Sequence, residues 1–237
     1  MISIADRPKL KFQSTFSNII AVGGFITLLL GIALPYINSK FMSMSFGLML
    51  GGMILSFIGI FILNRWGRKP RPEESLDNAL KKLPDSFRLY HYSGLPCKHI
   101  LLSPYGVTLF HTINWEGVFV YKNKRWKEMI NLGRAIRFPL EQHLGDPSKL
   151  ILNAEQEIRD YFKQLLGENN IPQIRPMIIF LHPKTKLEIE KSAIPVCKVD
   201  ALKKHIPIKG AKMPDEQYEK IKSALDGLYK PGLELKI

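Results

Sequence analysis

The chain has 237 residues, with 34 basic and 21 acidic side chains and a formal net charge of +13. This balance favours a polyanionic partner, such as nucleic acid, anionic lipid or an acidic protein face, although charge that merely keeps the protein soluble explains the same count. The two cysteines, Cys97 and Cys197, have no metal-binding or redox spacing, so we expect free thiols in a reducing compartment.

Two apolar runs without a charged residue, at about 17–37 and 41–64, lie near the start of the chain. Each can cross a hydrocarbon core, which takes about 20 apolar residues. Only Asn38, Ser39 and Lys40 separate them, so the two helices are predicted to be antiparallel neighbours. A second span that follows at once argues against a cleaved signal peptide, and two adjacent runs argue against buried soluble helices.

Basic residues flank the outer ends of both runs: Arg7, Lys9 and Lys11 before the first, and Arg65, Arg68, Lys69 and Arg71 after the second. The turn between the runs carries Lys40 alone. The positive-inside rule therefore predicts a multi-pass protein of the cell inner (plasma) membrane, with the lipid bilayer as a partner and both termini in the cytoplasm. Neither run contains an ionisable residue, which argues against transport or a proton relay.

Small residues recur four apart in the second run, as Gly47 with Gly51 and as Gly52 with Ser56. Such spacing lets helix backbones approach closely. We expect it to serve packing within the hairpin, and a homo-oligomer formed through the glycine-rich spans is the alternative.

Composition divides the chain into an N-terminal tail and hairpin (1–66), a basic linker (67–72), a soluble domain (73–210) and a C-terminal helix and tail (211–237). The residues after Asn64 carry a net charge of +10. The juxtamembrane bases Arg65, Arg68, Lys69 and Arg71 would attract anionic lipid headgroups, although the positive-inside rule accounts for the same charges.

Apolar periodicity in the first half of the soluble domain predicts a helix and an antiparallel meander in the middle of a sheet. Ser103, Pro104, Tyr105 and Gly106 form its central turn. The expected elements are a helix at 73–83 and strands at 87–92, 99–102, 107–112 and 118–121, with the chain turning back at 122–126.

The second half predicts a long helix that begins after Asp146 as N-cap and Pro147, and that ends near Gly167. Its expected buried residues are Leu150, Ala154, Ile158, Phe162 and Leu165. Strands are expected at 176–181 and 195–199, and helices at 199–205 and 214–228. The fold class is α/β, with helices flanking a mixed sheet.

Residues 98–117 contain a recognisable pattern: a histidine, three apolar residues, a small residue and proline, then Gly-Val, and finally Asn-Trp and glycine. This pattern resembles the core of the nuclease-related domain (NERD) family, a branch of the PD-(D/E)xK nuclease fold. The resemblance implies a PD-(D/E)xK-like mixed sheet behind the membrane hairpin. The scaffold positions that match the family core are Glu73, His99, Pro104, Gly106, Asn114, Trp115 and Gly117.

The positions that carry catalysis in that family do not match. Lys98 stands where the family has aspartate, His111 where it has glutamate, and Ile113 where it has lysine, while Leu150 replaces a glutamine of the later helix. Mg²⁺ requires hard oxygen ligands, and a lysine would repel it. We therefore expect a catalytically degenerate domain with no metal and no cofactor, which binds DNA, RNA or another polyanion without cleaving it.

Three alternatives stay open. Glu73 and Glu116 could hold a cation in a displaced site, which would make the protein an active metal-dependent nuclease. Cys97 and the histidines His91, His99 and His111 would come near one another if the strands pair, although they have no known metal-ligand spacing. A purely structural, membrane-tethered interaction domain is the third alternative.

Overall fold

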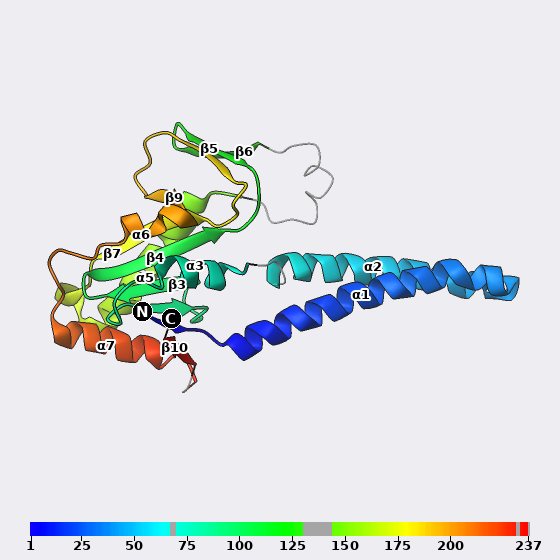
Figure 1. The fold of residues 1–237 in the computed structure, drawn as a ribbon, viewed down its shortest axis with the longest axis horizontal. Coiled ribbons are helices and arrows are strands. Elements are labelled where there is room, and N and C mark those ends of the chain that lie inside the picture. The colour runs from blue at the N-terminus through cyan, green and yellow to red at the C-terminus, as the bar shows by residue number, and fades with distance from the viewer. Residues whose placement is uncertain (67–69, 130–143, 231–232, 237) are drawn as a thin grey trace. The chain divides into compact units, whose positions relative to one another are not determined.

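The computed structural model describes residues 1–66, 70–129, 144–230 and 233–236. The chain divides into two compact units (Figure 1). A hairpin unit is built on Arg7–Arg71, and a sheet unit combines Met1–Asp6 with the chain that follows Pro72. Each unit is described separately below.

The hairpin unit consists of two long apolar helices, α1 (Arg7–Ile37) and α2 (Met42–Trp66), joined by the 3₁₀ turn η1 (Ser39–Phe41) and packed against each other. Both are long and apolar enough to cross a membrane, over 28 residues of the first helix and 24 residues of the η1–α2 segment. They are candidate membrane-spanning helices, as the sequence predicts. Length and composition alone are weak evidence of a membrane span.

Glycine lets the two helices approach each other closely. A Cβ atom added at Gly52 would lie 2.5 Å from the Leu28 backbone nitrogen, and one at Gly24 would lie 2.5 Å from the Ser56 nitrogen. Gly51, the next residue along α2, has nothing within 4 Å of such an atom. Gly52 and Ser56 therefore serve packing within the hairpin, whereas Gly51 does not.

The sheet unit is built on a mixed seven-stranded sheet with the order β10-β1-β2-β3-β4-β7-β9. These strands are β1 (Ile2–Ile4), β2 (Arg88–His91), β3 (His99–Ser103), β4 (Gly106–Ile113), β7 (Ile174–Phe180), β9 (Val196–Lys198) and β10 (Glu234–Lys236). Strands β2, β3 and β4 form the predicted antiparallel meander at the centre. Strands β1 and β7 flank the meander in parallel pairing with β2 and β4.

Helices cover both faces of this sheet. On one face α5 (Pro147–Leu166) and α7 (Asp215–Asp226) bury their apolar residues against β3, β4 and β7. On the other face lie α3 (Pro72–Leu80), the 3₁₀ turn η4 (Val199–Ala201) and α6 (Leu202–His205). The expected α/β class, with a mixed sheet flanked by helices, is confirmed.

The predicted continuation of the meander was wrong. Strands β5 (Val118–Lys122) and β6 (Arg125–Met129) belong to a separate three-stranded sheet with β8 (Lys186–Ile189), in the order β6-β5-β8. The position beside β4 is taken by β7, which pairs with it along seven residues. Because β4 already has a partner on each edge, the chain after Ile113 cannot pair with β4, and it pairs instead in the second sheet.

The two ends of the described chain also differ from the sequence analysis, which assigned Ile2–Ile4 to an N-terminal tail and 211–237 to a helix and tail. Strand β1 lies inside the main sheet, between β2 and β10. A three-residue strand gives too short a period to be recognised from sequence. One practical consequence is that a fragment beginning after the hairpin would lose an interior strand of the sheet.

Helix α5 begins as predicted, with the Asp146 side chain accepting a hydrogen bond from the Lys149 backbone nitrogen at 3.1 Å. Its buried face was assigned in part wrongly, because Leu150 and Leu165 are exposed. Ile151 is buried in place of Leu150, together with Ala154 and the later apolar positions. The other predicted helices and strands begin and end within a few residues of their expected limits, whereas β6, β8 and β10 were not predicted as strands.

We predict that Gly52→Leu destabilises the hairpin by about 1–3 kcal/mol, since the new side chain collides with the backbone of α1. Gly51→Leu is the matched control and should leave stability unchanged, because open space surrounds Gly51. SDS-induced unfolding of the full chain in mixed micelles, followed by circular dichroism, measures both. Equal losses for the two variants would contradict the packing described here.

Candidate functional site

Two of the three positions that the sequence analysis expects to be degenerate catalytic positions lie side by side at one end of the β3–β4 hairpin. The pairing of His99 with Phe110 brings Lys98 opposite His111. Burial, and secondarily the charge of Lys98, lowers the pKa of His111 to about 4. His111 is therefore neutral at physiological pH, and the ammonium group beside it opposes a divalent cation.

Ile113 lies two residues further along the same face of β4 and is buried in the core beneath α5. It offers this face no charge and no proton. Leu150, which the sequence analysis expects at a glutamine position of the NERD pattern, is exposed on α5. Within the described residues there is no group of three or more His, Cys, Asp or Glu side chains that could hold a metal ion.

The scaffold positions shape the turns around this hairpin. Gly106 has a φ of +126°, and a Cβ atom there would lie 2.5 Å from the Gln173 carbonyl oxygen. Only glycine fits this close approach, which allows the Val107 nitrogen to donate to the same carbonyl oxygen at 2.9 Å. Ser103 and Pro104 open the turn, in which the Ser103 hydroxyl accepts a hydrogen bond from the Tyr105 nitrogen.

The later scaffold positions join the two sheets. Trp115 donates through its indole nitrogen to Glu128 at 2.9 Å, and its carbonyl oxygen accepts from the Thr185 hydroxyl. The Gly117 carbonyl oxygen accepts from the Lys186 nitrogen at 2.9 Å. Asn114 lies beside them in the same connection, half-buried. These contacts connect the segment between β4 and β5 with β6 and with the start of β8.

A chain of three buried polar side chains lies on the opposite face of β2 and β3. His91 Nε2 is 3.1 Å from Asp77 Oδ1, and His91 Nδ1 is 2.8 Å from His99 Nδ1. A carboxylate only accepts, so with both rings neutral His91 donates to Asp77 and His99 donates to His91. The bare Nε2 atom of His99 is then an acceptor, and it is buried without a partner among the described residues.

Sequence reasoning brought His91 and His99 together but missed Asp77 and placed His111 with them. The alternation along β4 puts His111 on the other face of the sheet. Glu73 and Asp77, four residues apart on the buried face of α3, are the sequence signal for an acidic partner. Glu73 accepts a hydrogen bond from the Tyr92 hydroxyl at 3.0 Å.

Both cysteines are free, as the sequence predicts, and both are buried. The Cys97 thiol donates to the His99 backbone carbonyl oxygen at 3.2 Å, and burial raises the pKa of that thiol to about 11. Burial likewise raises the pKa of Cys197 to about 11. A thiolate is the reactive form, so neither residue is suited to nucleophilic chemistry.

The outward face of the three-stranded sheet is basic, and sequence reasoning did not single it out. Alternation directs the side chains of β6 to two sides: Trp126 and Glu128 are half-buried, whereas Arg125 and Lys127 are exposed. Lys122 on β5 and Lys186 on β8 lie on the same side of this sheet, with Lys186 opposite Val118; Glu188 lies on that side too, opposite Val120. We call Lys122, Arg125, Lys127 and Lys186 the basic face; the alternation of Arg125 and Lys127 was its sequence signal.

Like charges lie directly opposite each other within this face. Lys122 pairs with Arg125 across β5 and β6, an arrangement that costs stability. Glu190 offsets part of the charge through an ion pair with Lys122 at 3.1 Å. Residues of the basic face also line a hollow of about 630 Å³ around Val120.

The basic juxtamembrane residues are described only in part. Arg65 lies at the end of α2, and Arg71 precedes α3 directly. Arg68 and Lys69 lie outside the described residues. Glu116 is half-buried in the connection between β4 and β5, whereas Glu73 is fully buried on α3.

Comparison of the chain with models of protein families, with curated proteins and with solved structures gave no match. Inference about function therefore rests on the chain's own residues.

We predict that the free energy of unfolding falls as the pH drops from 6.5 toward 4. Burial, and secondarily the charge of Lys98, lowers the pKa values of His99 and His111, so the unfolded chain binds protons that the folded chain excludes. Each proton that the folded chain excludes adds up to about 1.4 kcal/mol per pH unit to the slope of the free energy of unfolding against pH. His111→Gln removes one contribution and should flatten the slope in urea unfolding of the full chain.

His205→Gln, which changes an exposed histidine on α6, is the control for this experiment. Asp77, Glu73 and every other titrating group are common to the variants, so differences between curves isolate His111. Parallel curves for wild type and His111→Gln would contradict the assignment.

Proposed function

We propose that this protein is a membrane-anchored module that binds nucleic acid without cleaving it. The basic face is the observation that carries the proposal, because its four exposed cations outnumber Glu188 and Glu190 on the same side of the three-stranded sheet. Cations at this density attract a polyanion and release its counterions on binding.

The geometry of the basic face favours a regular polymer over isolated lipid headgroups. Arg125 and Lys127 alternate along β6, so their Cα atoms are about 7 Å apart. The Lys122–Arg125 pairing lowers the stability of the fold, and a bound phosphate chain would offset that cost. The hollow around Val120 gives such a chain a concave seat.

Absence of cleavage is inferred from the chemistry of the degenerate positions. The resemblance to the NERD family would place the catalytic centre at Lys98, His111 and Ile113. A cationic side chain, a neutral half-buried imidazole and a buried isoleucine cannot supply the hard oxygen ligands that Mg²⁺ needs. On this account the nuclease-like scaffold is retained for binding.

Membrane anchoring is supported by the way the hairpin joins the sheet unit. Strand β1 precedes α1, and α3 follows α2, yet β1 and α3 belong to the same unit. Both ends of the hairpin must then lie in one compartment, which an even number of spans satisfies. The flanking positive charges put that compartment in the cytoplasm.

For the binding proposal we predict that the full chain, in nanodiscs of zwitterionic lipid, binds labelled DNA with an affinity that falls linearly with salt on logarithmic axes. The double variant Arg125→Glu with Lys127→Glu should bind more weakly and lower the salt slope by about 2, because it loses two phosphate contacts. Fluorescence anisotropy across a salt series measures both effects.

The matched control reverses the same charge at two exposed lysines that do not belong to the three-stranded sheet, Lys149→Glu with Lys230→Glu. An equal loss of DNA affinity in the control would show that the effect comes from net charge and not from the basic face. Binding to anionic vesicles but not to DNA or RNA would replace the proposal with headgroup binding, and no binding to either would leave a structural interaction domain.

The competing enzyme hypothesis is tested in the same samples with Mg²⁺ or Mn²⁺ added. We expect no cleavage above background. Metal-dependent cleavage that disappears in Glu116→Ala or Glu73→Ala would establish a nuclease with displaced carboxylates and overturn the binding-only proposal.

For the membrane topology we predict that a reporter fused after Ile237 is cytoplasmic and that one inserted at Ser39 is extracytoplasmic. The reason is the flanking charge together with the shared unit of β1 and α3. Paired activity reporters for the two compartments measure the outcome. A cytoplasmic signal at Ser39 would show that the hairpin does not cross the membrane.

A further inference from the structure

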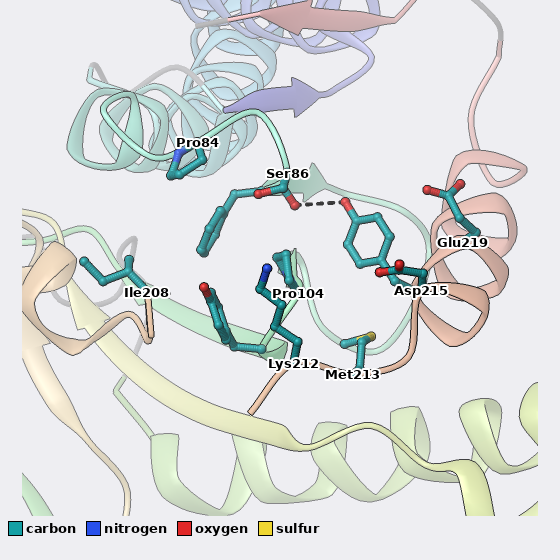
Figure 2. A pocket seen from close by; sticks show the side chains of 11 residues that line it. Pro84, Ser86, Pro104, Ile208, Lys212, Met213, Asp215 and Glu219 are labelled. Atoms are coloured by element: carbon teal, nitrogen blue, oxygen red, sulfur yellow. Dashed lines mark hydrogen bonds between the residues drawn. The ribbon is translucent and has the colours of Figure 1, made fainter. Parts of the chain in front are cut away.

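The sheet unit contains a pocket of about 360 Å³ in which three segments meet (Figure 2). They are the turn before β2, the β3–β4 turn and the stretch from Ile208 to the first turns of α7. The pocket is separate from the basic face and from the degenerate catalytic positions, since it shares no lining residue with either.

Aromatic rings form the walls of this pocket. Phe87 is buried, and its ring centroid is 6.3 Å from that of the half-buried Tyr105. Tyr218 closes the α7 side and donates its hydroxyl to the Ser86 carbonyl oxygen at 2.9 Å (Figure 2). The exposed parts of the Tyr105 and Tyr218 rings give a flat ligand an apolar surface on which to stack.

Backbone contacts fix these walls before any ligand arrives. The Met213 nitrogen donates to the Pro104 carbonyl oxygen at 2.8 Å, which ties the segment before α7 to the β3–β4 turn. Arg175 donates to the Tyr105 carbonyl oxygen at 2.9 Å. A preformed pocket loses less free energy in ordering when it binds.

Three charged side chains line the pocket: Lys212, Asp215 and Glu219, of which Glu219 forms an ion pair with Lys222 at 2.8 Å. The Lys212 side chain reaches into the hollow, and Asp215 lies on the α7 side (Figure 2). Neither side chain has a hydrogen bond or an ion pair with any residue that the structure describes. Unpaired, they suit a ligand with an anionic group for Lys212, a hydrogen-bond donor for Asp215 and a flat ring between them.

The surrounding charge selects among ligands of that kind. The stretch 203–222, which includes the first turns of α7, carries six lysines and three acidic residues, a net charge of +3. A peptide or a free amino acid gains little from this surplus, whereas the phosphates of a nucleic acid strand gain from every lysine. Bases in a duplex are already stacked, so only a single strand can offer a base to Tyr105 and Tyr218.

We infer that this pocket holds one unstacked base of a single-stranded nucleic acid, with Lys212 on a neighbouring phosphate and Asp215 accepting a hydrogen bond from the base. The inference rests on the proposed function and specifies the form of its nucleic acid. A carboxylate accepts from the exocyclic amine of cytosine, whereas thymine presents an acceptor at that position. The pocket should therefore prefer cytosine over thymine.

The test measures fluorescence anisotropy with the full chain in zwitterionic nanodiscs and labelled oligo(dC), oligo(dT) and a duplex. Wild type should bind oligo(dC) most tightly and the duplex least tightly. Lys212→Ala should weaken single-strand binding more than Lys209→Ala, a lysine of the same stretch outside the pocket. Asp215→Ala should abolish the preference for oligo(dC), whereas Glu216→Ala, its neighbour outside the pocket, should keep it.

Stacking is tested at Tyr105. Tyr105→Leu should cost single-strand binding roughly tenfold and leave duplex binding unchanged, whereas Tyr105→Phe retains the ring and should bind like wild type. If Tyr105→Leu disturbs the packing against Phe87, the variants Lys212→Ala and Asp215→Ala still test the pocket, because both change exposed side chains.

The outcomes separate this inference from the proposed function. Equal binding of single strand and duplex would overturn the inference about the pocket, and so would equal effects of Lys212→Ala and Lys209→Ala. Either result would leave the proposal for the basic face standing. Failure to bind any nucleic acid would overturn both.

Discussion

Strand β4 is the constraint on which the sheet unit depends. It pairs with β3 on one edge and with β7 on the other, and helices cover both of its faces. At its start, Gly106 approaches the Gln173 carbonyl oxygen and sets the turn that forms one wall of the aromatic pocket. At its end, both edges are occupied, so the chain leaves to build the sheet that carries the basic face. The pairing of β4 on both edges therefore determines where the basic face and the aromatic pocket lie in the fold.

The histidines in the interior are neutral, whereas the positive charge of the protein is carried by lysines on its surface. His99 and His111 are kept neutral by burial, which stabilises the fold near neutral pH and weakens it in acid. The Asp77–His91–His99 chain orients two imidazoles in the interior without forming a site that substrate can reach. Positive charge instead lies on the surface, at the basic face and along 203–212, where a long polyanion could engage several lysines at once.

The connection between hairpin and sheet gives the protein an unusual dependence on its first residues. Strand β1 is an interior strand, so pairing on both of its edges requires the segment before α1. Separating the sheet from the apolar helices would remove backbone hydrogen bonds from β2 and β10 at once. The apolar hairpin and the folding of the sheet are coupled through this short strand.

Sequence alone determined the features that depend on local periodicity and punctuation. These are the two apolar helices and their turn, the β2–β3–β4 meander around Gly106, and the start of α5 at Asp146 and Pro147. Tertiary structure decided the pairings between distant segments. Strand β1 is too short to show a hydrophobic period. The edge of β4 that was expected to pair with β5 pairs with β7. On α5, Ile151 rather than Leu150 is buried in the core. The pocket joins residues more than a hundred positions apart, such as Phe87 and Tyr218, and only the packing of α7 against the sheet brings their side chains together.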